Sequence, residues 1–589
     1  MVPLLLAMAL ISVLGYRNSK YARWIALLGS LASLVLLYFI SYGSYSLSWF
    51  SIGTASISIS SVITPINMLL LFIVLLVAPL VFVYSFGFMK VPSEQRRFYL
   101  EMLAFESAML VFAMSGDFIT LFIAWEFLSL MSYLLIGFYH QKETASRAAR
   151  KAMTIVLIGD IALLASMIIL WDAFGSLSFA AIFSSINTNI PSLYVAVLLL
   201  IVAILTKSAQ FPFQEWLPDA MEGPTPVSAF LHSTTMVKAG VFALVLLYPL
   251  FFATRTLPVL FAFGVITVIL STLNALKETQ IKRVIAYSTV QELGLMIVAA
   301  STGSIIACLY FFLVQSFYKA LLFFSAGSVM ETSGEEDLRR ASGLRQNRLV
   351  YITTLFGVLA LAGFVPFSGF FANAAIGSSL ISNAYIYTII SLVGLSTSFF
   401  IFRWFFLASK KPKSSKIEVA YRTLPKTMIL SMLILAILAL AGSAAFFYLP
   451  GFLGSQSYYL SAFIKPGGLS IGFYDAILET AVAILGVLVS YIIFVHNKSL
   501  PSSISSVVYN SGFVNWLYNY FAKLVSGFSE GVVLFDVWVG DLFEDLGKAV
   551  ELLGRAIRRF SVGNINLYVA IFSLAVVLGF LYVYLYGGL

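Results

Sequence analysis

Long apolar stretches restrict the possible folds of this chain more than any other feature. An α-helix rises 1.5 Å per residue, so about 20 apolar residues cross the roughly 30 Å hydrocarbon core of a bilayer. The 589 residues are 60% hydrophobic and only 10% charged, whereas soluble domains carry roughly 25% charged residues. The sequence therefore predicts an all-α polytopic membrane protein. About sixteen transmembrane helices are expected, at residues 2–15, 21–42, 62–86, 98–115, 118–139, 152–172, 192–211, 226–248, 257–276, 281–300, 304–330, 350–368, 385–408, 427–449, 473–495 and 566–586.

The positions of the lysines and arginines predict the orientation of these helices. Inner loops of membrane proteins carry an excess of Lys and Arg. With the N-terminus outside, 29 of the 35 Lys and Arg residues fall in inner loops or at inner helix ends, and only Arg255 and Lys465 fall in outer loops. A wrong helix count would scramble this asymmetry, so we expect the N-terminus outside. The net charge of +9 could suggest that the protein binds nucleic acid, but this distribution of the charges argues against it.

Two segments outside the spanning helices have patterns of their own. Residues 43–61 are uncharged and alternate Ser with β-branched or aromatic residues, which predicts a short hairpin at the outer surface. From Phe513 to Phe560, apolar residues recur at helical spacing among many charged ones. We therefore expect a lateral amphipathic helix that lies along the membrane or along other helices. The only cysteine, Cys308, lies in an apolar stretch, so we expect no disulfide and no Cys-ligated metal. No flavin, quinone or cluster motif appears in the sequence, so we expect no cofactor.

Several ionisable residues lie deep inside the predicted helices, where a charge costs several kcal/mol. A Glu–Lys pair at about 4 Å is worth roughly 4 kcal/mol at an effective dielectric near 20, so separating the partners changes the proton affinity of the lysine about a thousandfold. A small displacement is therefore enough to load or discharge a proton. The candidates for proton translocation are Glu126, Asp160, Lys207, His232, Lys238, Glu292 and Lys319. Arg403, near an inner helix end, is instead expected to extend toward the inner surface.

Two prolines predict breaks in apolar helices of the two halves of the chain. Pro212 follows Lys207 in the sequence FPF, and Pro366 lies in the sequence VPF. Proline lacks an N–H and clashes with the preceding turn, so each helix must break there. Broken helices in both halves are typical of transporters built from inverted repeats. The expected regions are N-terminal transmembrane helices (1–97), a first antiporter-like repeat (98–248), a second antiporter-like repeat (257–408), C-terminal transmembrane helices (409–512), a lateral amphipathic helix (513–565) and a terminal transmembrane helix (566–589).

Five motifs resemble the antiporter-like, proton-pumping subunits of respiratory complex I, and most closely its distal L-type subunit. They are KSAQFPFQEWLPDAMEGPTPVSAFLHSTTMVKAGV from Lys207, WEFLSLMSYLLIGFYH from Trp125, IKRVIAYSTVQELG from Ile281, KALLFFSAGSV from Lys319 and LAGFVPFSGFF from Leu361. The resemblance covers nearly the whole chain. It implies a proton-translocating subunit in the plasma membrane of a prokaryote, with the redox chemistry of an NADH:quinone oxidoreductase located in other subunits. The implied partners are other membrane-arm subunits, the lipid bilayer and protons, with sodium as an alternative ion.

The resemblance also implies roles for individual residues. The glutamate at position 126 pairs with the lysine at 207 in that family, and the aspartate at 160 modulates the pair. His232 and Lys319 then continue the polar axis toward the second half.

The chain departs from the family pattern in its second half. Phe311 and Gln315 stand where two histidines are usual, Asn373 and Ala374 stand where a Lys–Asp pair is usual, and Glu292 stands where a glutamine is usual. Because the usual exit residues are missing, we hypothesise that Glu292 and Lys319 form a substitute pair.

Two further interpretations stay open. The chain is alternatively the large subunit of a multi-subunit sodium/proton antiporter, or of a related hydrogenase or inorganic-carbon system, although the lateral segment and the single final helix argue against this. A structural subunit that has lost transport is the other alternative, suggested by Asn373 and Ala374.

Overall fold

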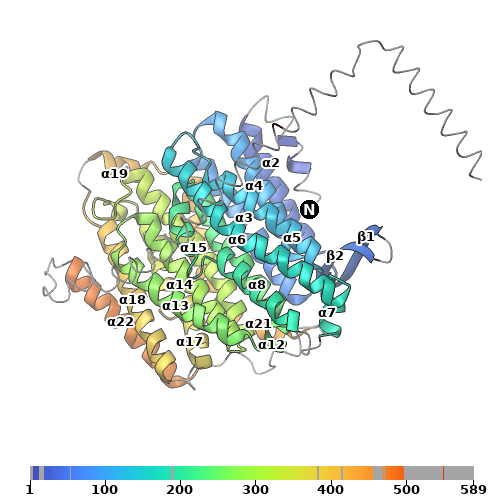
Figure 1. Ribbon diagram of the computed structural model, residues 1–589. Helices are drawn as coiled ribbons and strands as arrows, with labels where there is room; N and C mark the ends of the chain where they lie inside the picture. Colours follow the sequence, from blue (N-terminus) through green and yellow to red (C-terminus); the bar gives the residue numbers. More distant parts are fainter. Residues whose placement is uncertain are drawn as a thin grey trace, which may run out of the picture. The chain divides into compact units, whose positions relative to one another are not determined.

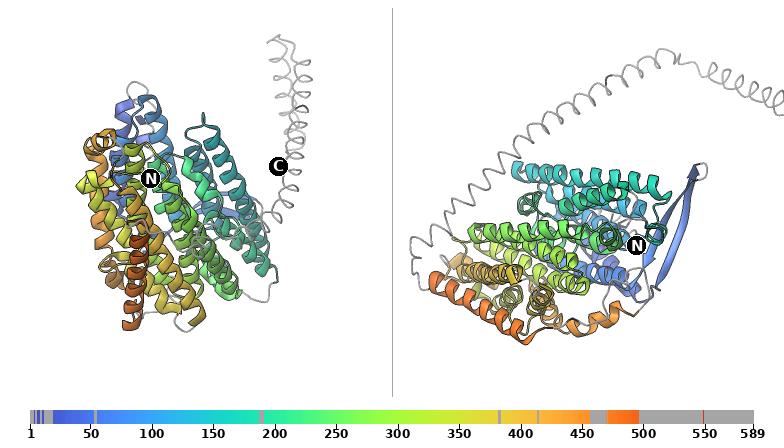
Figure 2. Two further views of the ribbon diagram at one scale, coloured as in Figure 1. Left: turned by 90° about the vertical axis from the view of Figure 1, so that its left-hand side faces the viewer. Right: turned by 60° about the horizontal axis from the view of Figure 1, so that its bottom comes forward.

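The computed structural model describes residues 19–52, 55–186, 191–380, 384–412, 415–455 and 471–495, with isolated positions at 4, 6–8, 10, 11, 469 and 548. The described helices belong to one compact unit, Met1–Pro501, in which they pack side by side (Figures 1 and 2). The predicted lateral helix (513–565), the terminal helix (566–589) and most of the stretch at 2–15 lie outside the described residues.

The predicted helices 21–42 to 473–495 each coincide with helical structure. The helices are α2 (Ser19–Leu37), α3 (Pro65–Phe88), α4 (Pro92–Ala113), α5 (Phe118–Ile136), α6 (Glu143–Phe174), α8 (Pro191–Lys207), α10 (Thr225–Ser233), α11 (Met236–Leu246), α13 (Leu257–Lys277), α14 (Ile281–Ser301), α15 (Ile305–Ser333), α16 (Arg348–Leu361), α18 (Ala384–Ala408), α20 (Lys426–Ala441) and α22 (Phe473–Phe494). Among the described residues, nine helices are long and apolar enough to cross a membrane, counting α10 and α11 as one span. The chain is thus a mostly helical, polytopic membrane protein, and the total of sixteen spans stays a prediction.

Shorter elements connect these helices. They are α7 (Phe179–Ser184), α9 (Trp216–Asp219), η1 (Ala220–Glu222), α12 (Tyr248–Ala253), η2 (Leu344–Gln346), α17 (Ser368–Leu380), α19 (Ser415–Arg422) and α21 (Ala445–Leu453). The predicted hairpin is confirmed: β1 (Gly43–Ile52) pairs antiparallel with β2 (Ala55–Ile63), and the register joins Gly43 to Ile63. Asp117 fixes this hairpin to α5, because its carboxylate accepts from Ser60 N and from Thr120 N at the start of that helix.

The two breaks that the prolines predict are confirmed. Helix α8 ends at Lys207 before Pro212, and α16 ends at Leu361 before Pro366, after which α17 begins. Both prolines follow a cis peptide bond.

Two further breaks contradict the uninterrupted helices expected at 226–248 and 427–449. The first lies between α10 and α11, where the Thr235 hydroxyl donates to Phe230 O (2.8 Å) and so competes with the helical backbone. The second bends α20 by 73° relative to α21. Here Tyr310 OH donates to Gly442 O (3.2 Å), and a Cβ at Gly442 would lie 3.2 Å from Val314 Cγ1. The bend therefore lies where the chain contacts α15, which is remote in sequence.

Helix α15 occupies the interior of the unit. It packs against α3, α10, α14, α16 and α20 and is buried over its hydrophobic span, as are α10 and α11. Helix α14 is almost as deeply buried, whereas α22 is largely exposed on the surface of the described unit. The helices that carry His232, Lys238, Glu292 and Lys319 therefore form the core.

Candidate functional site

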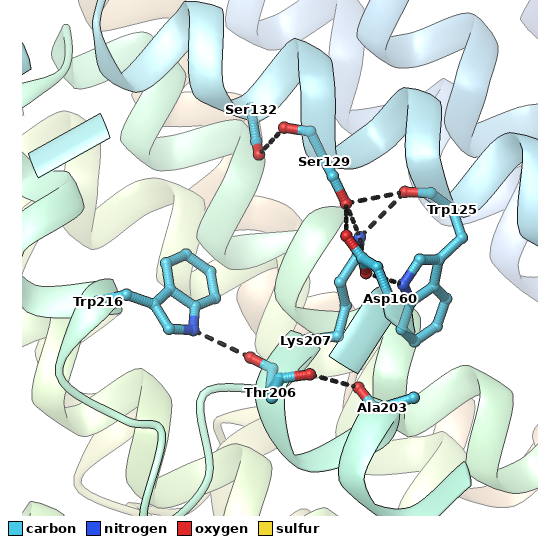
Figure 3. A network of polar contacts seen from close by, with 8 residues as sticks. All are labelled: Trp125, Ser129, Ser132, Asp160, Ala203, Thr206, Lys207 and Trp216. Atoms are coloured by element: carbon cyan, nitrogen blue, oxygen red, sulfur yellow. Dashed lines mark hydrogen bonds and ion pairs between the residues drawn. The ribbon is translucent and has the colours of Figure 1, made fainter. Parts of the chain in front are cut away.

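Lys207 and Asp160 form the centre of the first polar cluster. Lys207 ends α8 with its side chain 0% exposed, and Asp160 on α6 is 2% exposed. The Lys207 Nζ lies 4.0 Å from Asp160 Oδ1 and donates to Trp125 O (3.0 Å) and Ser129 Oγ (2.6 Å). Ser129 Oγ in turn donates to Asp160 Oδ2 (3.0 Å), and the Trp125 indole N–H donates to Oδ1 (2.6 Å) (Figure 3). A single hydroxyl therefore bridges the ammonium and the carboxylate.

Glu126 does not make the contact with Lys207 that the family resemblance implies. It is half-buried on α5 between the exposed side chains of Ile123 and Phe127, and no ion pair within 4.0 Å joins it to Lys207 in the described part of the chain. Successive residues of a helix are 100° apart, so when Trp125 and Ser129 face Lys207, Glu126 is turned aside. Asp160 is the carboxylate that contacts the lysine here, and the role of Glu126 stays a prediction.

A glycine beside Asp160 brings α6 close to α8. A Cβ at Gly159 would overlap Thr206 Oγ1 and lie 3.1 Å from Ala203 Cα. The Trp216 indole N–H donates to Thr206 O (2.9 Å), which satisfies a carbonyl group at the C-terminal end of α8 (Figure 3). The helix end that carries Lys207 is thus held against Asp160 by backbone packing.

The two helix breaks have the same spacing. In the first, α8 ends at Lys207, two residues before Ala209 (φ 49°) and five before Pro212. In the second, α16 ends at Leu361, two residues before Gly363 (φ 76°) and five before Pro366. Leu361 therefore occupies the position in the second break that Lys207 occupies in the first. The second half has no lysine at this position.

His232 and Lys238 lie on either side of the break between α10 and α11. His232 is buried between the rings of Trp216 and Phe323, with centroid distances of 6.4 and 6.0 Å. Neither of its ring nitrogens has a hydrogen-bond partner in the described residues. Lys238, also buried, donates to Phe312 O and Ser316 Oγ on α15, and no carboxylate of the described residues lies within 4.0 Å of it.

Glu292 and Lys319 make the contact that the sequence analysis predicted. Lys319 Nζ lies 2.9 Å from Glu292 Oε2, with the side chains 0% and 4% exposed, and it donates to Ser288 Oγ (2.5 Å). Tyr318 OH donates to Glu292 Oε1 (2.8 Å) and Gln315 Nε2 donates to Oε2 (3.2 Å). Gln315 and Glu292 both depart from the family pattern, which usually has histidine at the first position and glutamine at the second. In this structure the two residues contact each other.

Helix α15 joins Lys238 to this pair. Phe312, Ser316 and Lys319 are spaced by four and three residues, so they follow one face of the helix. Lys238 contacts the first two, while Lys319 contacts Glu292. The structure therefore places three titratable side chains in sequence along the buried interior.

Two further residues differ from expectation. Arg403 does not extend toward a surface: it is buried and donates to the carbonyl oxygens of Ala275, Leu276 and Glu278 at the end of α13. Glu479 was missed by the sequence analysis, although it lies inside the predicted helix 473–495. It is 8% exposed and lines a cavity together with Glu292. The depth argument that selected Glu126 would have found it.

Comparisons with known proteins support the motifs described above. The sequence profile described as "NADH:quinone oxidoreductase/Mrp antiporter, TM" matches residues 115–401, and that of the "NADH-Ubiquinone oxidoreductase (complex I), chain 5 N-terminus" matches residues 49–99. NAD(P)H-quinone oxidoreductase chain 5 of Picosynechococcus sp. is 29% identical over 91% of this chain and 89% of its own length. NADH-quinone oxidoreductase subunit L of Mycobacterium tuberculosis is 36% identical over 56% of this chain.

The chain belongs to the antiporter-like family of membrane subunits, and to its chain 5, or subunit L, type. It spans 53% of the length of the M. tuberculosis relative and 57% of the length of an NAD(P)H-quinone oxidoreductase subunit 5 of Paulinella chromatophora. Among solved structures, a chain of the Mrp complex from Dietzia sp. DQ12-45-1b has a TM-score of 0.72 at 22% identity, over 90% of this chain and 60% of that one. That likeness shows that the two chains share a fold.

Proposed function

We propose that this chain is a proton-translocating subunit of the membrane arm of a complex I-like quinone oxidoreductase. The single observation that carries the proposal is the buried contact of Lys207 with Ser129 and Asp160. A charged pair is costly to bury in a membrane interior. Ser129 accepts from the lysine and donates to the carboxylate, so a proton leaving the ammonium has a hydroxyl to receive it and an acid beyond. The proposed complex is taken from the names of the relatives, which are chains of an NADH- or NAD(P)H-quinone oxidoreductase.

We further propose an order in which the candidate residues act. Lys207, with Asp160 and with Glu126 as an additional carboxylate, loads a proton in the first repeat (98–248). His232 and Lys238 carry it across the break between α10 and α11. Lys319 and Glu292 receive it in the second repeat (257–408). The electron carriers belong to other subunits, and coupling acts through small displacements that separate each lysine from its carboxylate.

The orientation, location and partners complete the proposal. The excess of Lys and Arg in alternate loops supports an N-terminus outside the plasma membrane of a prokaryote. The partners would be the neighbouring membrane-arm subunits, which the lateral segment at 513–565 is suited to bind.

The test is proton transport by the assembled complex in inside-out membrane vesicles. Lys207→Ala is expected to abolish substrate-driven acidification while the complex still assembles. The matched control is Lys90→Ala, because Lys90 is a lysine with 63% side-chain exposure that pairs with Glu331 at the surface. Acidification at the unmodified rate in Lys207→Ala would refute the proposed site.

A sodium/proton antiporter subunit is the second candidate, supported by the fold shared with a chain of an Mrp complex. Purification of the complex separates the two. Co-purifying redox subunits and donor-driven acidification support the first candidate, whereas sodium-driven acidification without an electron donor supports the second.

A further inference from the structure

A cavity lies next to Glu292, and Lys319 is not among its lining residues. It is bounded by α14, α16, α17, α18 and α22, and its polar lining consists of Gln291, Glu292, Asn373, Thr397 and Glu479. The space open to the centre of a water molecule is about 20 Å³, above the roughly 10–15 Å³ that one water needs. The buried Gln291 Oε1 has no hydrogen-bond partner among the described residues. This cavity is therefore polar enough and large enough to admit water.

Glu479 closes one wall of this cavity. It is 8% exposed on a helix that is otherwise among the most apolar of the chain. Its carboxylate oxygens lie close to two glycines on neighbouring helices: a Cβ at Gly377 would be 3.8 Å from Oε1, and a Cβ at Gly394 would be 3.7 Å from Oε2. These are ordinary van der Waals distances, so the carboxylate lies beside both α17 and α18. Glu292 and Glu479 are the two carboxylic acids among the lining residues.

Contacts along α18 give the relative heights of the two glutamates. Trp404 of α18 donates to Ile281 O at the start of α14, and Gln291, beside Glu292, donates to Thr397 Oγ1 (2.6 Å). Gly394, beside Glu479, is three residues further along α18 than Thr397 in the same direction. At 1.5 Å per residue this is about 4.5 Å. Glu292 follows Gln291 by one residue, so Glu479 lies about 3 Å beyond Glu292, away from the start of α14. Glu479 is only six residues from the first residue of α22.

We propose that Glu479 is a proton acceptor that takes protons from Glu292 across this cavity and releases them toward the Phe473 end of α22. In this step the Glu292 carboxyl O–H bond breaks, the proton passes through water, and an O–H bond forms on a Glu479 carboxylate oxygen. Glu292 is left as a carboxylate facing the Lys319 ammonium, so charge and protons balance. Asn373 and Thr397 line the cavity but cannot serve as the acceptor, because neither titrates near neutral pH. This inference rests on the proposed function, since it supplies the outer end of the same proton path.

The test uses the assembled complex in inside-out vesicles, with donor oxidation and acidification measured together. Glu479→Gln is expected to lower acidification at least tenfold with the complex still assembled. Glu479→Asp, which keeps a carboxylate, should retain most of the transport. The decisive variant is the double change Glu479→Gln with Asn373→Asp, which moves the carboxylate to α17 in the lining of the same cavity, in a side chain of unchanged shape. It should restore at least half of the acidification.

Two controls separate the possible outcomes. Glu106→Gln neutralises a buried glutamate that contacts Ser30 Oγ (2.7 Å) on α2, outside the proposed path, and should transport normally. Normal acidification in Glu479→Gln overturns the inference, and so does a loss that neither Glu479→Asp nor the double variant restores, because a packing role would then explain it. If Lys207→Ala is inactive and Glu479→Gln is active, only this inference fails. If both are active, the proposed function fails as well.

Discussion

Removing the Lys319 side chain should destabilise the protein by more than the lost packing alone would, because Glu292 would lose its counter-charge. The two charged atoms lie 2.9 Å apart in a fully buried site. At an effective dielectric near 20 their attraction is about 5.7 kcal/mol. Breaking a buried pair by removing one partner costs about 3–5 kcal/mol in proteins. Lys319→Met keeps an unbranched side chain of similar length, so most of this cost would come from the unpaired carboxylate.

The double variant Lys319→Met with Glu292→Gln tests this origin. Glutamine has the shape of glutamate, and its oxygen can still accept from Tyr318 OH, which donates to Glu292 Oε1 in this structure (2.8 Å). With both charges removed, neither of the two positions holds an unpaired charge. The double variant should therefore be more stable than Lys319→Met alone, and its cost should fall below the sum of the two single variants by about 3 kcal/mol, the upper range for residues in contact.

The assay is reversible unfolding of the purified chain in mixed micelles, followed by tryptophan fluorescence. Lys90→Met is the matched control, since its pair with Glu331 is exposed by 63% and 29%, and exposed pairs are worth only about 0–1 kcal/mol. Additive costs in the double variant, or a loss of less than about 1 kcal/mol in Lys319→Met, would contradict the coupling that the geometry implies. In vesicles the double variant should not transport protons even though it folds.

Three further changes test the first polar cluster by acidification in vesicles, with assembly of the complex as the check on folding. Asp160→Asn leaves Lys207 without its contacting carboxylate and should lower transport at least tenfold, so near-normal transport would remove Asp160 from the path. Gly159→Ala places a methyl group against α8 and should lower transport by separating the two helices, an expectation that unchanged transport would contradict. Ser129→Ala removes the hydroxyl bridge and should lower transport several-fold. Ser132→Ala should have little effect, because the Ser132 hydroxyl donates to the Ser129 carbonyl oxygen (2.7 Å) and not to Lys207 or Asp160 in the described structure. Equal effects of the two serine variants would refute the bridge.

The sequence alone predicted where the described helices from 21–42 to 473–495 lie, and it showed which helices carry the charges. Spanning stretches follow from hydrophobicity along the chain, and the breaks at Pro212 and Pro366 follow from a missing N–H, which is a local property. The contact between Glu292 and Lys319 was also predictable, because two opposite charges at similar depth in an apolar interior must find partners.

Only the tertiary structure decided which acid meets Lys207 and where the second half continues. Asp160 contacts the lysine in place of Glu126 because the rotation of α5 and the close approach of α6 at Gly159 set the facing side chains. The bend at Gly442 and the cavity shared by Glu292 and Glu479 likewise arise from helices that are distant in sequence. The depth of a residue in a membrane depends on its own helix. Its neighbours depend on how that helix is rotated and on how it packs against other helices. The average hydrophobicity of one helix specifies neither its rotation nor its packing partners.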